Sequence, residues 1–550
     1  LTEDRVFDQL ENGATLVTVN RRLAGYCLDR YAAVQQQRGH SVWETPDVLP
    51  YGTWLERCWQ KACACWPQSR GEPPMLLSSH QQQLVWEDVL ADSDAGKALL
   101  HREAAARTVD DARRLCRQWQ LPVTDKTQWT GTDPAAFYAW AAEFDRRLEN
   151  HNWLDRHGLA DEIRNALLKD HLSPPRTMIF YGFDDMAPQQ AALIDALQQR
   201  GCHAAMQALP ECGGEAVRCG FADREAEIAA VSRWVRHRLK HFPDRRIGVV
   251  VPRLADYRQS LVRVFDDVLH PGAVLSPQQP ESRAYNISLG PPLSDYPIIE
   301  TAFDLLFMAV DPPPVTRWTA LLLSPLLAGA DRELSNRAAF DARLREKGEL
   351  TLSVARMLQW LEKSRQTGGQ GNCPIFYHHL QQFLQVFRQL PKKQAPAQWS
   401  RDFSSLLEAL GWPGERPLNS HEYQTVSAWH EALSRFAALG DVSVEMRYAD
   451  ALDMLKRIVD QTLFQPEGGD VAVQVMGMLE AGGEVFDDLW IMGIDQSAWP
   501  PSPRPNPFIP MHLQHRKNLP HSTPARELAY SRQLTRRLLS AAENVTVSYP

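Results

Sequence analysis

Four short runs of apolar, mostly β-branched residues constrain the fold of this chain more than any other feature of its sequence. They are Thr15–Val19, Thr177–Tyr181, Arg246–Val251 and Asp488–Gly493. Each run has the length of a strand and leads through turn residues into a helical pattern, which is typical of strands buried in a parallel sheet. Two further strands are expected near the end of the chain, at Val471–Met476 and Asn544–Tyr549. This order predicts an α/β fold built on parallel sheets rather than a β-sandwich.

Long stretches with helical periodicity separate these strands. Residues 54–170 contain the expected helices Gln81–Leu90 and Ala135–Asn150. Residues 298–465 read in the same way, and their expected helices are Ile298–Met308, Phe376–Leu390 and Ala449–Thr462. A chain of 550 residues is too long for one hydrophobic core. The pattern therefore predicts sheet-containing domains that are interrupted by two helical insertions.

The charge balance limits how such a chain could bind nucleic acid. Its net charge is -8 and its isoelectric point is near 6.1, so a DNA-binding face has to be a local concentration of Lys and Arg. Nine cysteines are scattered along the chain, a usage that fits a reducing compartment better than a disulfide framework. No signal segment or membrane-spanning run is visible in the sequence. We expect a cytoplasmic protein without membrane contact.

Motifs for nucleotide and hydrolytic chemistry are missing from the sequence. A phosphate-binding G-x-x-x-x-G-K-[ST] loop is absent, because the one lysine that directly follows a glycine, Lys97, is followed by Ala98. No G-x-G-x-x-G segment follows a strand, and neither H-E-x-x-H nor G-x-S-x-G occurs. No lysine has Asp or Glu two positions before it, as a PD-(D/E)XK nuclease requires. The sequence therefore predicts no catalytic residue for ATP or DNA hydrolysis.

Two groups of cysteines and two pairs of acids could bind metal. Cys58, Cys63 and Cys65 form one group, and Cys202-His203 with Cys212 and Cys219 forms the other. Neither group has paired C-x-x-C spacing, which favours buried or inert thiols over a zinc site. Asp184-Asp185 follows the run Thr177–Tyr181 as the Mg²⁺-binding acids of a nucleotide site do. Without a phosphate loop we interpret these acids as a strand end, and Asp487-Asp488 as a turn that enters a strand. No metal site is predicted.

Several segments, in the right order, resemble motifs of superfamily 1 helicases. Leu16–Ala24 resembles motif Ia, Asp223–Val251 the entry to the second motor domain, Val471–Pro500 motif V, and Leu528–Tyr530 with Leu538–Tyr549 motif VI. Tyr181-Gly182-Phe183-Asp184 followed by Pro188-Gln189 is similar to a turn of AddB-like and RecB-like proteins. The chain thus resembles the B subunit of bacterial AddAB-type helicase–nucleases, and above all a proteobacterial "probable DNA repair protein" branch with a degenerate helicase domain.

This resemblance implies a fold and a domain plan. The fold would be two RecA-like domains with two large helical insertions. The first RecA-like domain would comprise residues 1–55 and 171–210, and the second would comprise 211–285 and 466–550. The insertions would be residues 56–170 and 286–465. In relatives of this kind a PD-(D/E)XK nuclease domain follows, so a nuclease would be expected beyond Pro550, and Mg²⁺ only together with it.

The positions that touch nucleotide in active relatives are altered here. Gly482-Gly483 replaces a functional segment of motif V, and the arginine of motif VI that touches the γ-phosphate falls at Ser540. Asp184 and Asp185 remain as a degenerate acidic pair. Loss of the arginine removes charge that stabilises phosphoryl transfer. The resemblance therefore implies a scaffold that neither binds nor hydrolyses ATP and has no cofactor of its own.

The same resemblance points to residues that could bind DNA. Asn20, Arg21 and Arg22 occupy the motif Ia position, where helicases contact the backbone of a single strand. A capped, solvated helix start explains these three residues equally well. Further basic candidates are Arg253, the pair Arg516-Lys517, and the clusters Arg233–Arg246 and Arg532–Arg537.

Two functions remain open from the sequence. The chain could be a DNA repair or recombination protein that binds single-stranded DNA or DNA ends, with a helicase subunit as a further partner. It could instead be a non-catalytic interaction scaffold that docks a helicase or nuclease partner.

Overall fold

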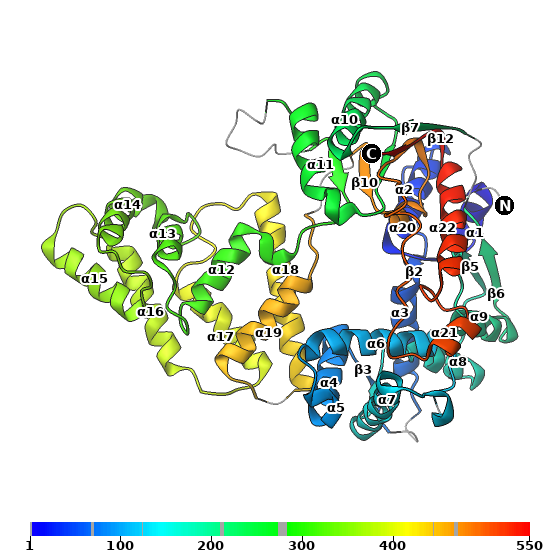
Figure 1. Cartoon of the computed structure of the whole chain (residues 1–550), viewed down its shortest axis with the longest axis horizontal. Coiled ribbons are helices and arrows are strands. Elements are labelled where there is room, and N and C mark those ends of the chain that lie inside the picture. Colours follow the sequence, from blue (N-terminus) through cyan, green and yellow to red (C-terminus); the bar gives the residue numbers. More distant parts are fainter. Residues whose placement is uncertain are drawn as a thin grey trace. The chain divides into compact units, whose positions relative to one another are not determined.

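The computed structural model describes residues 3–67, 71–123, 125–209, 214–272, 283–443, 445–466 and 471–550. The chain divides into two compact units. Unit 1 contains Leu1–Leu289 and Gly468–Pro550, and unit 2 contains Gly290–Glu467. Unit 1 holds two parallel sheets and their covering helices, whereas unit 2 is helical (Figure 1). The predicted α/β class with parallel sheets and many helices is confirmed.

The first sheet of unit 1 has four parallel strands in the order β2-β1-β5-β6. The strands are β1 Thr15–Thr18, β2 Val48–Pro50, β5 Thr177–Tyr181 and β6 His203–Gln207. The central pair β1 and β5 was expected from the sequence, and its register places Thr15 opposite Met178 and Thr18 opposite Tyr181. The two edge strands were missed. β2 has only three residues, and β6 is exposed over much of its length, so neither carries a long apolar run.

Alternate side chains of the central strands point to opposite faces of this sheet. Leu16 and Ile179 pack with α1 and α2 on one face. Val17 and Phe180 pack on the other face with α3, α8 and α9. These helices are α1 Glu3–Glu11, α2 Arg21–Gln37, α3 Tyr51–Ala64, α8 Leu159–Leu168 and α9 Pro188–Gln199. Burial on both faces explains why β1 and β5 lack a polar alternation.

A helical segment separates α3 from α8. It contains α4 Ser79–Asp92, α5 Asp94–Lys97, α6 Arg102–Gln118, the 3₁₀ turn Lys126–Gln128, α7 Thr132–His151, and a two-stranded ribbon of β3 Met75–Leu76 and β4 Trp153–Leu154. The rings of Trp86 on α4 and Phe144 on α7 stack with their centroids 3.9 Å apart. The expected helices Gln81–Leu90 and Ala135–Asn150 lie within α4 and α7, respectively.

The second sheet of unit 1 has six parallel strands in the order β7-β12-β11-β8-β10-β9. The strands are β7 Glu215–Gly220, β8 Ile247–Val250, β9 Tyr285–Ile287, β10 Val473–Met476, β11 Phe486–Ile491 and β12 Ala542–Tyr549. The four strands expected in this part of the sequence are confirmed with shifted ends. The two outermost strands, β7 and β9, were missed.

One sequence interpretation in this sheet was wrong. Asp487 and Asp488 lie inside β11 and do not form a turn before it. Asp488 is fully buried, and its carboxylate oxygens lie 3.4 Å from both Arg238 and Arg245. Asp487 accepts a hydrogen bond of 2.8 Å from the backbone N–H of Arg246. The strand tolerates these acids because each has a partner on α10 or on the segment that enters β8.

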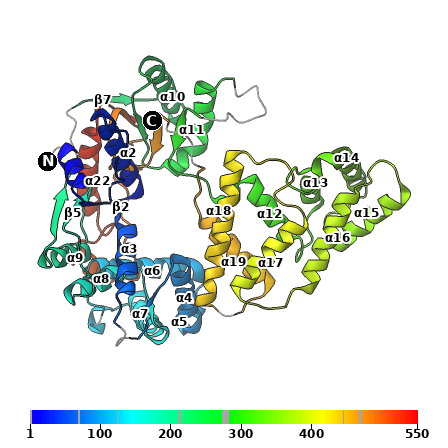
Figure 2. The ribbon, with the colours of Figure 1, turned by 180° about the vertical axis from the view of Figure 1, so that it is seen from behind.

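Helices cover both faces of the second sheet. α10 Arg224–His241 and α11 Leu254–Leu269 lie side by side on one face (Figures 1 and 2). α20 Met478–Ala481 and α22 Pro524–Leu539 cover the other face, and α21 Met511–Arg516 precedes α22. The two faces have separate apolar cores, so the central strands β8, β10 and β11 are buried from both sides.

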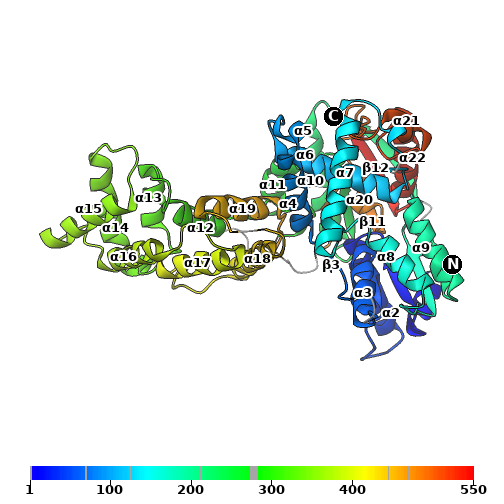
Figure 3. The ribbon, with the colours of Figure 1, turned by 90° about the horizontal axis from the view of Figure 1, so that it is seen from below.

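Within its described residues, unit 2 consists of helices and short turns without a sheet (Figure 3). Its helices are α12 Pro297–Phe307, α13 Val315–Leu323, α14 Ala330–Glu346, α15 Val354–Thr367, α16 Pro374–Gln389, α17 Pro396–Ala409, α18 Ser420–Ala437 and α19 Tyr448–Gln461, with 3₁₀ turns at Leu293–Asp295 and Ala438–Asp441. The three helices expected here are confirmed to within about two residues at each end. Buried tryptophans, including Trp399 and Trp429, form its core. No helix among the described residues of either unit is both long and apolar enough to cross a bilayer.

Candidate functional site

The carboxyl ends of β1 and β5 lie side by side at one edge of the first sheet, which is where open α/β sheets bind ligands. After β1 the chain turns at Asn20, whose side chain accepts a hydrogen bond of 2.8 Å from the N–H of Leu23 and so caps α2. After β5 it turns at Gly182, which has φ +82°, and a Cβ there would lie 2.7 Å from the Leu23 side chain. The two turns therefore pack directly on one another.

The acids that follow β5 are held by arginines from the end of the chain. Arg537 forms an ion pair with Asp184, and Arg526 forms one with Asp185. The side chain of Gln533 adds a hydrogen bond of 3.3 Å to the carbonyl oxygen of Asp184. The three donors lie on one face of α22, at positions i, i+7 and i+11. Both carboxylates are thus engaged by guanidinium groups at the position where a nucleotide site would use them to hold Mg²⁺.

Arg537 and Tyr530 are the most perturbed groups of this cluster. Burial lowers the pKa of Arg537, although Asp184 favours its charged form. Two of its guanidinium nitrogens, Nε and Nη2, are buried and have no hydrogen-bond partner among the described residues. Burial also raises the pKa of Tyr530, with a further contribution from Asp184 and Asp185. The arginines of the cluster are largely buried, whereas Asp184 and Asp185 are partly exposed to water.

A second ionic contact joins α2 to the turn before β11. Glu484 is buried, and its carboxylate lies 3.7 Å from Nε of Arg22 and 3.0 Å from Nη2 of Arg246. Burial raises the pKa of Glu484, while the two arginines oppose this shift. The guanidinium of Arg246 also lies over the ring of Tyr26 on α2, 4.9 Å from its centroid. Glu484 thus connects the two sheets through a pair of cations.

The two glycines before Glu484 serve close packing. A Cβ on Gly482 would lie 2.7 Å from Leu534 of α22, and a Cβ on Gly483 would lie 3.4 Å from Cβ of Leu23. A side chain at position 482 would therefore crowd Leu534, whereas a Cβ at position 483 would meet Leu23 at an ordinary contact distance. Ser540 is the C-cap of α22, and its hydroxyl donates a 3.0 Å hydrogen bond to the carbonyl oxygen of Arg537. It lies one helical turn after the arginine that does contact the β5 acids.

We call this set of contacts the sheet junction: Arg22, Gly182, Asp184, Asp185, Gly482, Gly483, Glu484, Arg526 and Arg537. Its contacts join residues that are distant in the sequence, such as Asp184 and Arg537, which are 353 positions apart. Sequence reasoning singled out Asp184, Asp185, the glycines and Arg22, but it missed Glu484 and the role of Arg526 and Arg537. The arginine spacing on one face of α22 was visible, yet nothing in the sequence indicates which acids that face would meet.

The other candidate DNA-binding residues lie in different surroundings. Arg21 is exposed at the start of α2 and has no ion-pair partner among the described residues. Arg253 precedes α11 and lies 3.8 Å from Asp495 and 3.7 Å from Asp256. Arg516 at the end of α21 donates a 2.9 Å hydrogen bond to Gln128, and Lys517 beside it is exposed. Of the motif Ia candidates, Arg21 alone keeps a guanidinium that an anion could bind without breaking an ion pair.

The carboxyl edge of the second sheet contains a buried acid that sequence reasoning did not single out. Glu227 of α10 is fully buried and accepts a 2.9 Å hydrogen bond from the N–H of Gly493 and another from the hydroxyl of Ser548. Ser548 in turn accepts a 2.8 Å bond from the indole N–H of Trp490. The second carboxylate oxygen of Glu227 has no partner among the described residues, and burial raises the pKa of this group.

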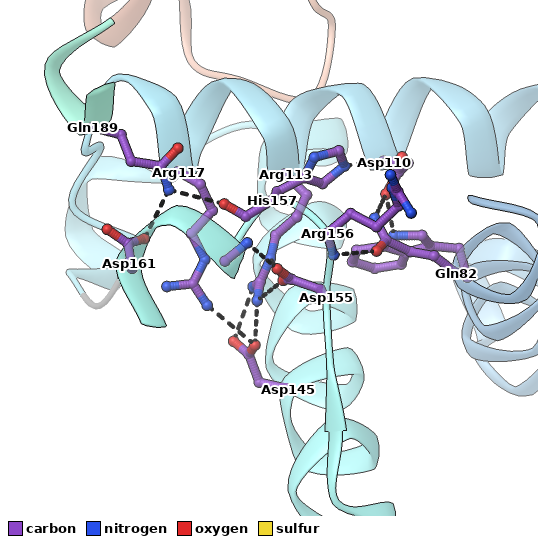
Figure 4. A network of polar contacts seen from close by, with 12 residues as sticks. Gln82, Asp110, Arg113, Arg117, Asp145, Asp155, Arg156, His157, Asp161 and Gln189 are labelled. Carbon is purple, nitrogen blue, oxygen red and sulfur yellow. Dashed lines mark hydrogen bonds and ion pairs between the residues drawn. The ribbon is translucent and has the colours of Figure 1, made fainter. Parts of the chain in front are cut away.

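A polar network in the helical segment also contains groups of catalytic type (Figure 4). Asp110 lies 3.1 Å from Nε2 of His157 and accepts bonds from Gln82 and from Nε1 of Trp86, the latter at 2.9 Å. Burial works against ionisation of Asp110, but these hydrogen bonds prevail and lower its pKa. Gln189 of α9 donates to the carbonyl oxygen of His157 at 2.9 Å. Each of these hydrogen bonds links one element to another, which indicates a structural role.

The same network contains a buried arginine between two acids (Figure 4). Arg113 donates to Asp155 at 2.6 Å and to Asp145 at 2.6 Å, and Arg113 and Asp155 are almost inaccessible to solvent. Arg117 approaches Asp145 to 3.9 Å. These contacts attach α6 to α7 and to the segment before α8. Such a network of paired charges fixes the relative position of helices.

The cysteine groups form no metal site among the described residues. Cys58 is buried and Cys65 is exposed, and burial raises the pKa of Cys58 to about 11. Cys202 is buried and Cys219 is partly exposed, whereas Cys212 lies outside the described residues. No described group of three or more His, Cys, Asp or Glu side chains is arranged to hold a metal ion.

Comparisons with known proteins add no assignment. No family model matches the chain, and no curated protein matches it either. The interpretation of the sheet junction therefore depends on its own geometry.

Proposed function

We propose that this chain is a DNA repair or recombination protein of the AddB/RecB-like type, with an inactivated helicase scaffold that binds single-stranded DNA or DNA ends in the cytoplasm. Its two parallel sheets would be two RecA-like domains, formed by residues 1–55 with 171–210 and by 211–285 with 466–550. The helical segments 56–170 and 286–465 would be insertions in these domains. The observation that carries the proposal is that Asp184 and Asp185 are each paired with an arginine of α22.

This pairing argues for a scaffold without ATP hydrolysis. A carboxylate that holds Mg²⁺ for phosphoryl transfer has to offer its negative charge to the metal. Here a guanidinium neutralises each carboxylate, and the turn at Gly182 packs closely on Leu23 at the start of α2. The absence of a phosphate-binding loop in the sequence supports the same conclusion. The junction is better suited to holding two domains together than to cycling between open and closed states.

The DNA contact of this proposal lies at Arg21. Arg21 is exposed at the start of α2, and the side chain of Asn20 caps this helix. A phosphate at this position would meet an unpaired cation next to a helix N-terminus, a combination that favours anions. Arg22 would contribute less, because its side chain already contacts Glu484.

Titration of the protein with fluorescent oligothymidine at several salt concentrations tests the proposal. We expect binding that weakens with salt, and the slope of log affinity against log salt should fall by about 0.7 in Arg21→Ala, as for one lost phosphate contact. Arg401→Ala is the matched control, because Arg401 is an exposed helical arginine of unit 2 without an ion-pair partner among the described residues. No salt-dependent binding, or equal losses in both variants, would overturn the DNA contact. DNA-stimulated ATP hydrolysis by the wild type would overturn the inactive scaffold.

A further inference from the structure

The outer face of α10 carries a row of exposed basic residues. They are Arg233, Arg236, His237, Lys240 and His241, which we call the α10 stripe. Their spacing of three, four, seven and eight residues from Arg233 places them on one side of the helix. The opposite side of α10 packs on the second sheet through Ile228, Val231 and Val235. The stripe therefore faces away from the core.

The cations of the stripe are not paired with acids. None of Arg233, Arg236 and Lys240 has an ion-pair partner among the described residues, and α10 has no acid after Glu227. Arg238, in contrast, turns toward the sheet and lies 3.4 Å from Asp488. The chain as a whole has a net charge of -8. The stripe is therefore a local region of positive charge on a protein with an overall negative charge.

Stabilisation of the helix end does not account for the whole stripe. Basic side chains in the last turn of a helix interact favourably with its dipole, and this effect decays within that turn. Lys240 and His241 lie in the last turn, but Arg233 and Arg236 precede it. The two arginines therefore need another explanation.

We propose that the α10 stripe binds the sugar–phosphate backbone of double-stranded DNA. This inference rests on the proposed function and extends it from the single strand at Arg21 to a duplex on a separate surface. From Arg233 to Lys240 the stripe extends over about 10 Å of helix axis, a length in which one strand of B-form DNA places about three phosphates. Three unpaired cations thus match three phosphates along one strand.

The surroundings of the stripe favour a phosphate backbone over an acidic protein. Protein interfaces usually have an apolar centre inside a polar rim. Phe242 is the large apolar side chain next to the stripe. The guanidinium carbon of Arg245 lies 4.8 Å from the centroid of its ring and so covers part of this apolar surface. A cationic row without an apolar centre is typical of contacts that position DNA without reading its sequence.

The test measures binding of a fluorescent blunt duplex and of oligothymidine by the wild type and by the triple variant Arg233→Glu, Arg236→Glu, Lys240→Glu. We expect at least tenfold weaker duplex binding, and a salt slope that is smaller by about three, because three phosphate contacts are lost. Oligothymidine binding through Arg21 should change much less. The matched control, Lys363→Glu, Lys392→Glu, Lys393→Glu, makes the same charge change at exposed lysines of unit 2.

The outcomes separate this proposal from the proposed function. Wild-type-like duplex binding by the stripe variant, or an equal loss in the control, overturns the inference even if oligothymidine still binds. Loss of binding to polyglutamate without loss of duplex binding assigns the stripe to an acidic protein and also overturns it. Failure of the wild type to bind oligothymidine defeats the single-strand proposal, whereas the stripe is judged by duplex binding alone. Thermal unfolding checks each variant, and Arg233→Gln, Arg236→Gln, Lys240→Gln replaces the glutamate set if that set unfolds.

Discussion

Glu227 shows how much a single buried side chain can influence this protein. One carboxylate oxygen is hydrogen-bonded by Gly493 and Ser548, and the other lacks a partner among the described residues. Because burial raises its pKa, the unfolded chain ionises Glu227 at a lower pH than the folded protein does. The contribution of this group to stability therefore decreases as pH rises from the unfolded pKa through the folded one.

Glu227→Gln should remove this pH-dependent loss, because the amide keeps an acceptor for Gly493 and Ser548 but cannot ionise. We compare the unfolding free energy of the variant with that of the wild type at each pH. We expect this difference to favour the variant by on the order of 1 kcal/mol more at pH 8 than at pH 5. Urea unfolding at both pH values measures the difference. The exposed neighbour Glu225 provides the control variant Glu225→Gln, for which no such change is expected. An equal wild-type-to-variant difference at the two pH values would show that Glu227 carries no such penalty.

At this scale the sequence was informative about local roles and uninformative about distant ones. Asn20 was interpreted either as a helix cap or as a DNA contact, and its capping bond to Leu23 is present. Such a bond joins neighbours in sequence, so residue type and position suffice to predict it. Asp184 and Arg537 are 353 positions apart, and no local pattern connects them. Glu227 lies in a segment rich in charged residues, so nothing in its sequence neighbourhood indicated that its side chain is buried.

At the scale of elements, α22 attaches the acids at the end of β5 to the second sheet. Its face from Arg526 to Arg537 holds both acids after β5, and its other side packs into the core of the second sheet through Leu534 and Leu538. The apolar contacts of α22 fix it only against the second sheet. We therefore expect the position of α22 relative to β5 to depend on the two ion pairs.

Asp184→Asn combined with Asp185→Asn tests this dependence. The change leaves two largely buried guanidiniums without counter-charges, and we expect a loss of about 1–2 kcal/mol in stability, since the acids themselves are partly exposed. Amide hydrogen exchange should accelerate in α22 and in the turn around Gly182, with unit 2 unaffected. Asp170→Asn is the control, because Asp170 forms an ion pair with Arg200 away from the junction. Unchanged exchange in α22 would mean that packing alone holds it.

Elements buried on both faces were predictable, whereas sheet edges were not. β1, β5, β8 and β11 are central or near-central strands, and their apolar runs appear directly in the sequence. β7 and β6 are edge strands with exposed side chains, so selection for a buried surface left little signal there. The sequence analysis identified the basic cluster Arg233–Arg246, but the division of α10 into a core side and a basic side depends on the sheet beneath it.

Across the whole molecule, arginine is used in two contrasting ways. In the sheet junction, Arg22, Arg526 and Arg537 are paired with acids and partly shielded from water. On α10, Arg233 and Arg236 are exposed and unpaired among the described residues. The net charge of -8 does not distinguish these two groups of arginines. Paired charges in the sheet junction largely cancel in the electrostatic field outside the protein, whereas unpaired charges on α10 do not. The proposed DNA binding should therefore respond to local charge changes more than to the overall charge.

The division into two compact units leads to an expectation for unfolding. Each unit has its own apolar core, with the fully buried Trp54 in unit 1 and the fully buried Trp429 in unit 2. Replacing either tryptophan by alanine should cost about 3–5 kcal/mol in its own core. If the cores unfold separately, Trp54→Ala shifts one denaturation transition and Trp429→Ala shifts the other, and the untouched transition serves as the internal control in each case. Calorimetry of the full chain with both variants measures this. A single transition that both substitutions lower equally would show instead that the two cores unfold as one cooperative system, and that the helical unit depends on the sheets for its stability.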